Sequence, residues 1–159
     1  IEHLARHDAL TDLPNRALLE ERLEHAVAWS RRTRDPVAVL ALDLDRFKAV
    51  NDIFGHAEGD RVLCRVADIL RSCTRTVDTV ARIGGDEFGL LLTHLDSGAA
   101  EAKARALARA VSEGTPRLPD GVIITGDDEV LISGGLTDRY QAIGDSPAAD
   151  AGKKATSGR

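Results

Sequence analysis

The chain has no methionine and few aromatic residues: one tryptophan, one tyrosine and three phenylalanines among 159 residues. Its core must therefore be built mainly from leucine, valine, isoleucine and alanine. With 43% hydrophobic residues, there are enough of them for one sizeable domain. Because the chain starts at Ile1 and contains no methionine, we expect it to be a fragment of a longer protein.

Cysteine is scarce, and long apolar runs are missing. Cys64 and Cys73 have no metal-ligand spacing around them, so we expect both to be buried, reduced thiols. No apolar run approaches the roughly 20 residues of a membrane-spanning helix, and the N-terminal stretch lacks the apolar core of a signal peptide. We therefore expect a cytoplasmic domain without a membrane segment.

The chain also has no excess of positive charge, since its formal net charge is −5. This argues against broad binding to a nucleic-acid polymer or to an anionic membrane. An anionic ligand would therefore need a metal ion to bind beside acidic side chains.

Two glycines and two acids follow one another in residues 84–88, Gly-Gly-Asp-Glu-Phe, between apolar runs that favour strands. The pattern predicts a hairpin with Asp86 and Glu87 at its tip, where the glycines would supply the positive φ of a tight turn. Adjacent carboxylates repel each other by about 1 kcal/mol or more unless a cation or a proton intervenes. The tip therefore favours a metal-dependent site.

Hydrophobic periodicity predicts alternating helices and strands, after the end of a helix over residues 1–8. We expect helices over about 16–33, 46–53 and 97–113, a helix from Glu58 or Asp60 to about Cys73, and strands over about 37–42, 80–83 and 88–92. Residues 126–129 predict the turn of a second hairpin, between strands at 121–125 and 130–137. The strand at 37–42 is apolar on both faces, which indicates a central strand covered from both sides.

The acids of two predicted elements can meet at one sheet edge. Asp43 follows the central strand, and Asp86 with Glu87 lies at the hairpin tip. Carboxylate oxygens are hard ligands that suit Mg²⁺ or Mn²⁺ carrying a nucleoside triphosphate. Asp43 alone could equally cap the N-terminus of a helix, but the two hairpin acids favour a metal site.

A helix predicted to start near Arg46 presents unpaired backbone N–H groups at the same strand end, where phosphates bind. Lys48 either adds a positive charge there or is a solvated surface lysine. Asp60 can accept both donors of the guanine Watson–Crick edge, although a helix N-cap is the alternative role. Asn51 can serve the base or the sugar edge, and His56 can line the pocket.

These segments together resemble the GGDEF family, the catalytic domain of diguanylate cyclases. Residues 84–88 match its signature, residues 8–16 resemble its D-x-L-T-x-L-x-N-R motif, and residues 43–60 resemble further motifs in the same order. The resemblance implies an α/β (α+β) fold like that of nucleotidyl cyclases: a ferredoxin-related, largely antiparallel central sheet flanked by helices, with the signature hairpin at one edge of the active site. It also implies that residues 1–8 end an upstream linker or signalling helix and that 9–159 form the domain.

The implied reaction condenses two GTP molecules into cyclic di-GMP and two pyrophosphates. It proceeds by metal-assisted attack of a 3′-hydroxyl on an α-phosphate across a homodimer. By resemblance Asp43, the main-chain carbonyl of Leu44 and Asp86 hold magnesium, with Glu87 in support. A carboxylate must also take the hydroxyl proton, and Asp86 or Glu87 is the candidate.

The resemblance also assigns the nucleotide contacts. Backbone amides near Arg46 and Phe47 would hold the terminal phosphates, Asn51 and Asp60 would recognise guanine, and His56 would line the nucleotide site.

An R-x-x-D pair, Arg75 and Asp78, stands upstream of the signature at the spacing of the family's inhibitory product site. The arginine can bind the O6/N7 edge of guanine, and the carboxylate can accept from N1 and the 2-amino group. Arg105 or Arg109 could complete such a site. The alternative is an exposed ion pair worth at most ~1 kcal/mol.

Residues 149–159 depart from the family's last helix: the segment is shorter and lacks its tyrosine, so neither Lys153 nor Lys154 can be matched to a phosphate contact. Two functions therefore stay open. One is an active cyclase. The other is a catalytically weak or inactive GGDEF module that binds GTP or cyclic di-GMP and regulates an attached domain. An unrelated magnesium phosphohydrolase is a more distant third.

Overall fold

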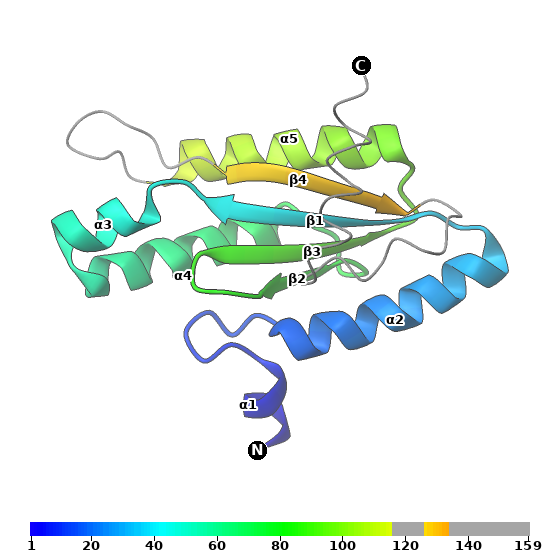
Figure 1. Cartoon of the computed structure of the whole chain (residues 1–159), viewed down its shortest axis with the longest axis horizontal. Coiled ribbons are helices and arrows are strands. Elements are labelled where there is room, and N and C mark those ends of the chain that lie inside the picture. The colour runs from blue at the N-terminus through cyan, green and yellow to red at the C-terminus, as the bar shows by residue number, and fades with distance from the viewer. Residues whose placement is uncertain (116–125, 134–159) are drawn as a thin grey trace.

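A computed structural model describes residues 1–115 and 126–133. Within them, a four-stranded antiparallel sheet of order β2-β3-β1-β4 carries helices on both faces (Figure 1). The elements are α1 (Glu2–Arg6), α2 (Arg16–Thr33), β1 (Val37–Leu44), α3 (Phe47–Phe54), α4 (His56–Ser72), β2 (Thr79–Arg82), β3 (Glu87–Thr93), α5 (Ser97–Gly114) and β4 (Gly126–Ser133). The predicted helix-flanked, largely antiparallel sheet is confirmed.

The central strand β1 is apolar on both faces because it contributes to two cores. Its residues Ala38, Leu40, Leu42 and Leu44 join the larger core with α3, α4 and α5, whereas Val37 and Val39 join a smaller core with α2. Successive side chains of a strand point to opposite faces of the sheet. One face is therefore covered by α4 and α5, with α3 packed on α4 at the end of this core, and the other face is covered by α2.

The helix α2 starts at a side-chain cap and lies close to the sheet. The Asn15 side chain accepts a hydrogen bond from the amide of Leu18 at 3.0 Å, which satisfies one of the amides that a helix start leaves unpaired. Leu19 then packs on β3 at Gly89, where an added Cβ would lie 2.7 Å from Leu19 Cδ2. A glycine at this position lets α2 approach the sheet.

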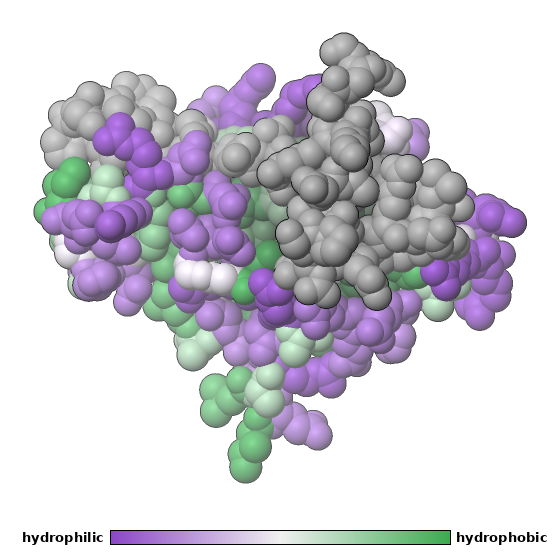
Figure 2. Space-filling view, viewed as in Figure 1, coloured by the Kyte–Doolittle hydropathy of each residue, from purple (hydrophilic) through white to green (hydrophobic). Residues whose placement is uncertain are grey.

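The short helix α1 is joined to the fold through the turn that follows it. Its carbonyls at Ala5 and Arg6 accept hydrogen bonds from the side chain and the backbone amide of Asn15, both at 2.9 Å. Ile1 and Leu4 are exposed, and the N-terminal tip shows apolar surface in the space-filling view (Figure 2). The described part of the core does not cover α1.

Three local expectations are wrong. Gly55, with φ +88°, separates α3 from α4, and α4 begins at once with His56, so Asp60 lies in its second turn and is no N-cap. Asp43 lies inside β1, and the N-cap of α3 is Arg46. Neither Asp60 nor Asp43 therefore has the capping role that was its alternative. The two cysteines, which were expected to be buried, are half-buried free thiols.

The turn predicted at residues 126–129 is also wrong, because these residues form the first half of β4. Gly126 pairs with Leu44 and Glu129 with Ala41 in the β1 ladder. Pairing with the central strand overrides the local turn preference of Gly and Asp. The strand expected at 121–125, residues 134–137 and the tail with Lys153 and Lys154 lie outside the described residues. Among the described helices, none has the length and apolar character needed to cross a membrane.

Candidate metal and nucleotide site

Three carboxylates meet at one end of the sheet. Asp43 and Glu87 are direct partners in the antiparallel pairing of β1 with β3. The main-chain carbonyl of Asp86 accepts a hydrogen bond from the amide of Leu44 at 3.1 Å, which holds the hairpin tip against β1. One carboxylate oxygen from each acid lies within 4.8 Å of those of the other two. The structure thus brings together the three acids that the sequence singled out.

These acids lie where the helical cover of the sheet ends. Asp43 is on the same face of β1 as Val37 and Val39, which pack under α2. Near its start, α2 reaches the sheet at Gly89, which pairs with Ala41 of β1. Asp43 is two residues beyond that point and is exposed, while Asp86 is half-buried. Ligands can therefore approach the three acids from solvent.

Gly84 and Gly85 do not have the positive φ that was expected for the hairpin turn. Among the described glycines, only Gly55 has a positive φ. Gly84 instead leaves room for Glu87: an added Cβ would lie 3.0 Å from its Oε2 and 3.3 Å from its Cβ. An added Cβ at Gly85 would meet nothing within 4 Å. The amides of Ile83 and Gly84 both donate to the carbonyl of Glu87, at 2.9 and 3.3 Å. Packing against Glu87 is what favours glycine at position 84.

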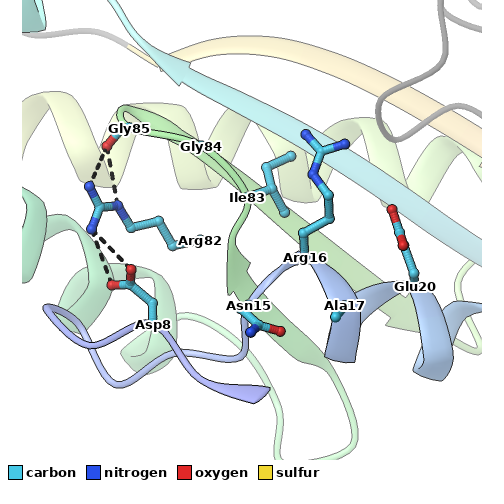
Figure 3. A pocket seen from close by; sticks show the side chains of 9 residues that line it. All are labelled: Asp8, Asn15, Arg16, Ala17, Glu20, Arg82, Ile83, Gly84 and Gly85. Carbon is cyan, nitrogen blue, oxygen red and sulfur yellow. Dashed lines mark hydrogen bonds and ion pairs between the residues drawn. The ribbon is translucent and has the colours of Figure 1, made fainter. Parts of the chain in front are cut away.

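Arg82 ties the hairpin tip to the N-terminal turn (Figure 3). Its Nη1 donates to both carboxylate oxygens of Asp8, at 3.1 and 3.2 Å, and its Nε and Nη2 donate to the carbonyl of Gly85, at 3.2 and 2.9 Å. Asp8 also accepts from the amide and hydroxyl of Thr11, at 2.9 and 2.7 Å. Gly85 directly precedes Asp86, so this clamp helps to fix a residue of the acidic cluster.

The clamp between Arg82 and Asp8 was not predicted from the sequence. The side chains of Arg82 and Asp8 are only 16% and 21% exposed. Burial by itself would raise the pKa of the Asp8 carboxyl, but the hydrogen bonds from Thr11 and Arg82 and the charge of Arg82 outweigh it, so the pKa lies below its ordinary value. The one available signal was that Asp8 opens the motif at residues 8–16.

An open pocket of about 550 Å³ lies beside the clamp (Figure 3). It is lined by the two clamp side chains, by the start of α2 and by the glycines of the hairpin: Asp8, Asn15, Arg16, Ala17, Glu20, Arg82, Ile83, Gly84 and Gly85. None of the three clustered acids lines it, so the pocket and the acidic cluster are separate features of the hairpin.

The start of α3 provides backbone donors near the end of β1. Its N-cap, Arg46, has φ 60° and ψ 19° and makes no side-chain capping hydrogen bond. The carbonyl of Arg46 accepts from the amide of Ala49 at 2.9 Å. The first amides of a helix, here those of Phe47 and Lys48, have no intrahelical acceptor. Lys48 is exposed, so both backbone and side-chain donors can meet a phosphate at this end.

Asn51 of α3 packs directly against α4. An added Cβ at Gly59 would stand 1.9 Å from Asn51 Oδ1 and 3.3 Å from Phe47 Cζ. Gly59 is buried, Asn51 is half-buried and the neighbouring Asp60 is exposed. The Asn51 carboxamide therefore lies beside the residue that precedes Asp60. His56 is exposed at the start of α4.

The Arg75–Asp78 pair is not the exposed ion pair offered as the alternative. The Asp78 side chain is only 1% exposed, and it accepts from Nε and Nη2 of Arg75 at 3.1 and 2.9 Å. It also accepts from the backbone amides of Arg75 and Thr93, at 3.0 and 3.4 Å. Arg75 is 47% exposed, while Arg105 pairs with Glu101 at 3.8 Å. Asp78 thus joins the loop before β2 to the end of β3.

Residues 5–120 match the family described as "Diguanylate cyclase, GGDEF domain". The diguanylate cyclase TpbB of Pseudomonas aeruginosa is 42% identical over 149 residues, which cover 94% of this chain and 33% of TpbB. The chain therefore spans about a third of the length of this relative.

Solved structures of GGDEF domains have a similar fold to this chain. A variant of TpbB comprising only its GGDEF domain superposes with a TM-score of 0.68 at 43% identity, covering 79% of this chain and 73% of that one. The coiled coil and GGDEF domain of DgcB from Caulobacter crescentus, solved with cyclic di-GMP, gives a TM-score of 0.78 at 23% identity, covering 97% and 83%. At that identity the second likeness concerns the fold alone.

Proposed function

The chain belongs to the GGDEF family of diguanylate cyclase domains, and from this premise we propose that it condenses two GTP molecules into cyclic di-GMP with release of two pyrophosphates. The observation that carries the proposal is the convergence of Asp43, Asp86 and Glu87, whose oxygens lie within 4.8 Å of one another. This cluster lies at the end of the sheet where α3 offers its first amides.

The donor set fits a divalent cation, because three carboxylates supply the hard oxygen ligands that Mg²⁺ and Mn²⁺ bind. Asp43, Asp86 and the main-chain carbonyl of Leu44 would hold the ion, with Glu87 in support. When bound, a divalent ion lowers the pKa of a coordinated hydroxyl and offsets phosphate charge. Mg²⁺ is the proposed cofactor, with Mn²⁺ as the alternative.

The proposed GTP contacts follow the arrangement of α3 and α4. The amides near Arg46 and Phe47, with Lys48, would bind the terminal phosphates at the helix start. Asn51 and Asp60 would read guanine, because a carboxylate accepts from both N1–H and the 2-amino group. These assignments are supported by the packing of Asn51 beside the start of α4. His56, which is exposed there, would line the nucleotide site.

A 3′-hydroxyl must lose its proton as it attacks the α-phosphate, and the proposed acceptor is Asp86 or Glu87. The two carboxylates are adjacent in the chain and share the acidic cluster. Either carboxylate could accept the proton, so we assign this role to the pair rather than to one residue.

The product requires two domains. One domain binding one GTP supplies one nucleophile and one α-phosphate, whereas cyclic di-GMP contains two equivalent phosphodiester bonds. A twofold homodimer meets this requirement by placing two half-sites face to face. In this proposal the active domain covers residues 9–159, and residues 1–8 end an upstream linker or helix. The clamp between Asp8 and Arg82 would connect the two.

We also propose product inhibition at Arg75 and Asp78. Because Asp78 already accepts from Arg75 and from the amide of Thr93, cyclic di-GMP would have to replace part of this bonding. Titration of cyclic di-GMP into wild type and Arg75→Ala tests this, with Arg32→Ala of α2 as an exposed control. Weaker binding by Arg75→Ala alone is expected. Equal affinities of all three would remove Arg75 from the site.

A second function is favoured by the departure of residues 149–159 from the family's last helix. It is a catalytically weak or inactive module that binds GTP or cyclic di-GMP and regulates an attached domain. The deciding experiment incubates the domain, held as a dimer by a fused coiled coil, with GTP and Mg²⁺, and resolves the nucleotides. Cyclic di-GMP formation that Asp86→Ala abolishes supports the cyclase, with Asp68→Ala of α4 as an acidic control. Binding of GTP without turnover supports the module.

A further inference from the structure

Two side chains of α3 converge on Gly59 of α4. Phe47 and Asn51, one helical turn apart on α3, both lie where a Gly59 side chain would stand. A Cβ there would be far inside van der Waals contact with Asn51 Oδ1. The Asn51 carboxamide can occupy its observed place only if residue 59 has no side chain.

The backbone does not require this glycine. Gly59 is the fourth residue of α4 and, unlike Gly55, has no positive φ. A glycine inside a helix costs about 0.5–1 kcal/mol relative to alanine. The glycine is therefore favoured by the room that it leaves for Asn51, and not by local conformation.

We propose that Gly59 is a positioning residue for nucleotide recognition, which it serves by allowing the Asn51 carboxamide to lie against Gly59, the residue that precedes Asp60. The inference rests on the proposed function, in which Asn51 and Asp60 together read guanine. Gly59 itself contacts no ligand in this account. It acts through Asn51, because any side chain at position 59 would push the amide away from its place against Gly59.

The clash falls on the end of a flexible side chain, which determines how a Gly59→Ala variant should behave. The Asn51 amide can rotate away at low cost, and alanine is the better helix former. The variant is therefore expected to fold with an unfolding midpoint close to that of wild type. Its binding of guanine nucleotides should fall by about tenfold, as for the loss of one or two hydrogen bonds to the base.

Calorimetric titration with α,β-methylene GTP, whose α–β bond is not broken, measures this affinity without turnover. Titration with the adenine counterpart and with Mn²⁺ alone completes the set. Gly59→Ala should lower affinity for the guanine analogue but not for Mn²⁺, so that preference over adenine shrinks. Gly114→Ala is the matched control, because Gly114 ends α5 and an added Cβ there would also meet a side chain of α4, 2.5 Å from Ile69 Cδ1. This control should leave guanine affinity unchanged.

A double variant tests whether Gly59 acts through Asn51. In an Asn51→Ala background the amide is gone, so adding Gly59→Ala should cause no further loss. Additive losses would overturn the proposal, as would wild-type affinity in Gly59→Ala or its failure to fold. A wild-type protein without preference for guanine would instead overturn the proposed function. Preference in wild type that survives in Gly59→Ala would overturn this inference alone.

Discussion

The ion pair between Asp8 and Arg82 joins the N-terminal turn to the signature hairpin, and its strength can be predicted from its burial. Exposed ion pairs contribute about 0–1 kcal/mol, whereas removing one partner of a fully buried pair costs about 3–5 kcal/mol. The two side chains are 21% and 16% exposed, and the contact is doubly hydrogen-bonded. We expect Arg82→Ala to lower the free energy of unfolding by about 2 kcal/mol.

Urea denaturation at pH 7 of wild type, Asp8→Asn, Arg82→Gln and the double variant gives the coupling energy directly. We expect about 1–2 kcal/mol. The pair Glu101–Arg105 on α5 is the matched control, since its atoms are 3.8 Å apart and its side chains are 49% and 71% exposed. Its coupling should stay below about 0.5 kcal/mol. A coupling for Asp8 and Arg82 no larger than that of the control would show that burial does not strengthen this ion pair.

The same pair should affect catalysis, because Arg82 holds the carbonyl that directly precedes Asp86. Its loss should lower kcat of the domain held as a dimer more than it raises KM for GTP, since the nucleotide contacts proposed on α3 and α4 are left intact. A change in KM alone would show that Arg82 does not position the acidic hairpin.

Three further outcomes are expected. Arg75→Ala should lower the free energy of unfolding in urea by about 3 kcal/mol, because it leaves the 1%-exposed Asp78 without its guanidinium, whereas exposed Arg105→Ala should change it by less than about 0.5 kcal/mol. Because the folded-state pKa of Asp8 is below the ordinary 3.8, its stabilisation is present above that pH and lost as the pH falls through the folded value. Asp8→Asn should therefore differ from wild type in urea at pH 7 and converge with it in acid. Asn15→Ala should cost about 1–2 kcal/mol in the same assay, because the cap of α2 and the bond to α1 are both lost.

Elements with a strong repeating pattern were predictable. The stripe of α2 and the doubly apolar β1 follow from periodicity alone, and the meeting of Asp43 with Asp86 and Glu87 follows from strand ends. The strand β4 was not predictable in the same way, because its turn-forming residues are held by pairing with β1.

Features that depend on distant partners were beyond sequence reasoning. Asp8 and Arg82 are 74 residues apart, and no local pattern links them. The contact that favours Gly59 comes from the side chain of Asn51 on another helix. In each case the residue type is set by a tertiary contact rather than by backbone conformation.

Metal-assisted synthesis of cyclic di-GMP at the three clustered acids is the central proposal for this chain. Its most direct test is nucleotide analysis by mass spectrometry after the dimeric domain is incubated with GTP and Mg²⁺, with and without a chelator, for wild type and Asp43→Asn. We expect wild type to form cyclic di-GMP and one pyrophosphate per GTP, and both chelation and Asp43→Asn to reduce the rate by at least about 100-fold. Undiminished cyclic di-GMP formation by Asp43→Asn, or conversion of GTP by wild type to GDP and phosphate, would contradict it.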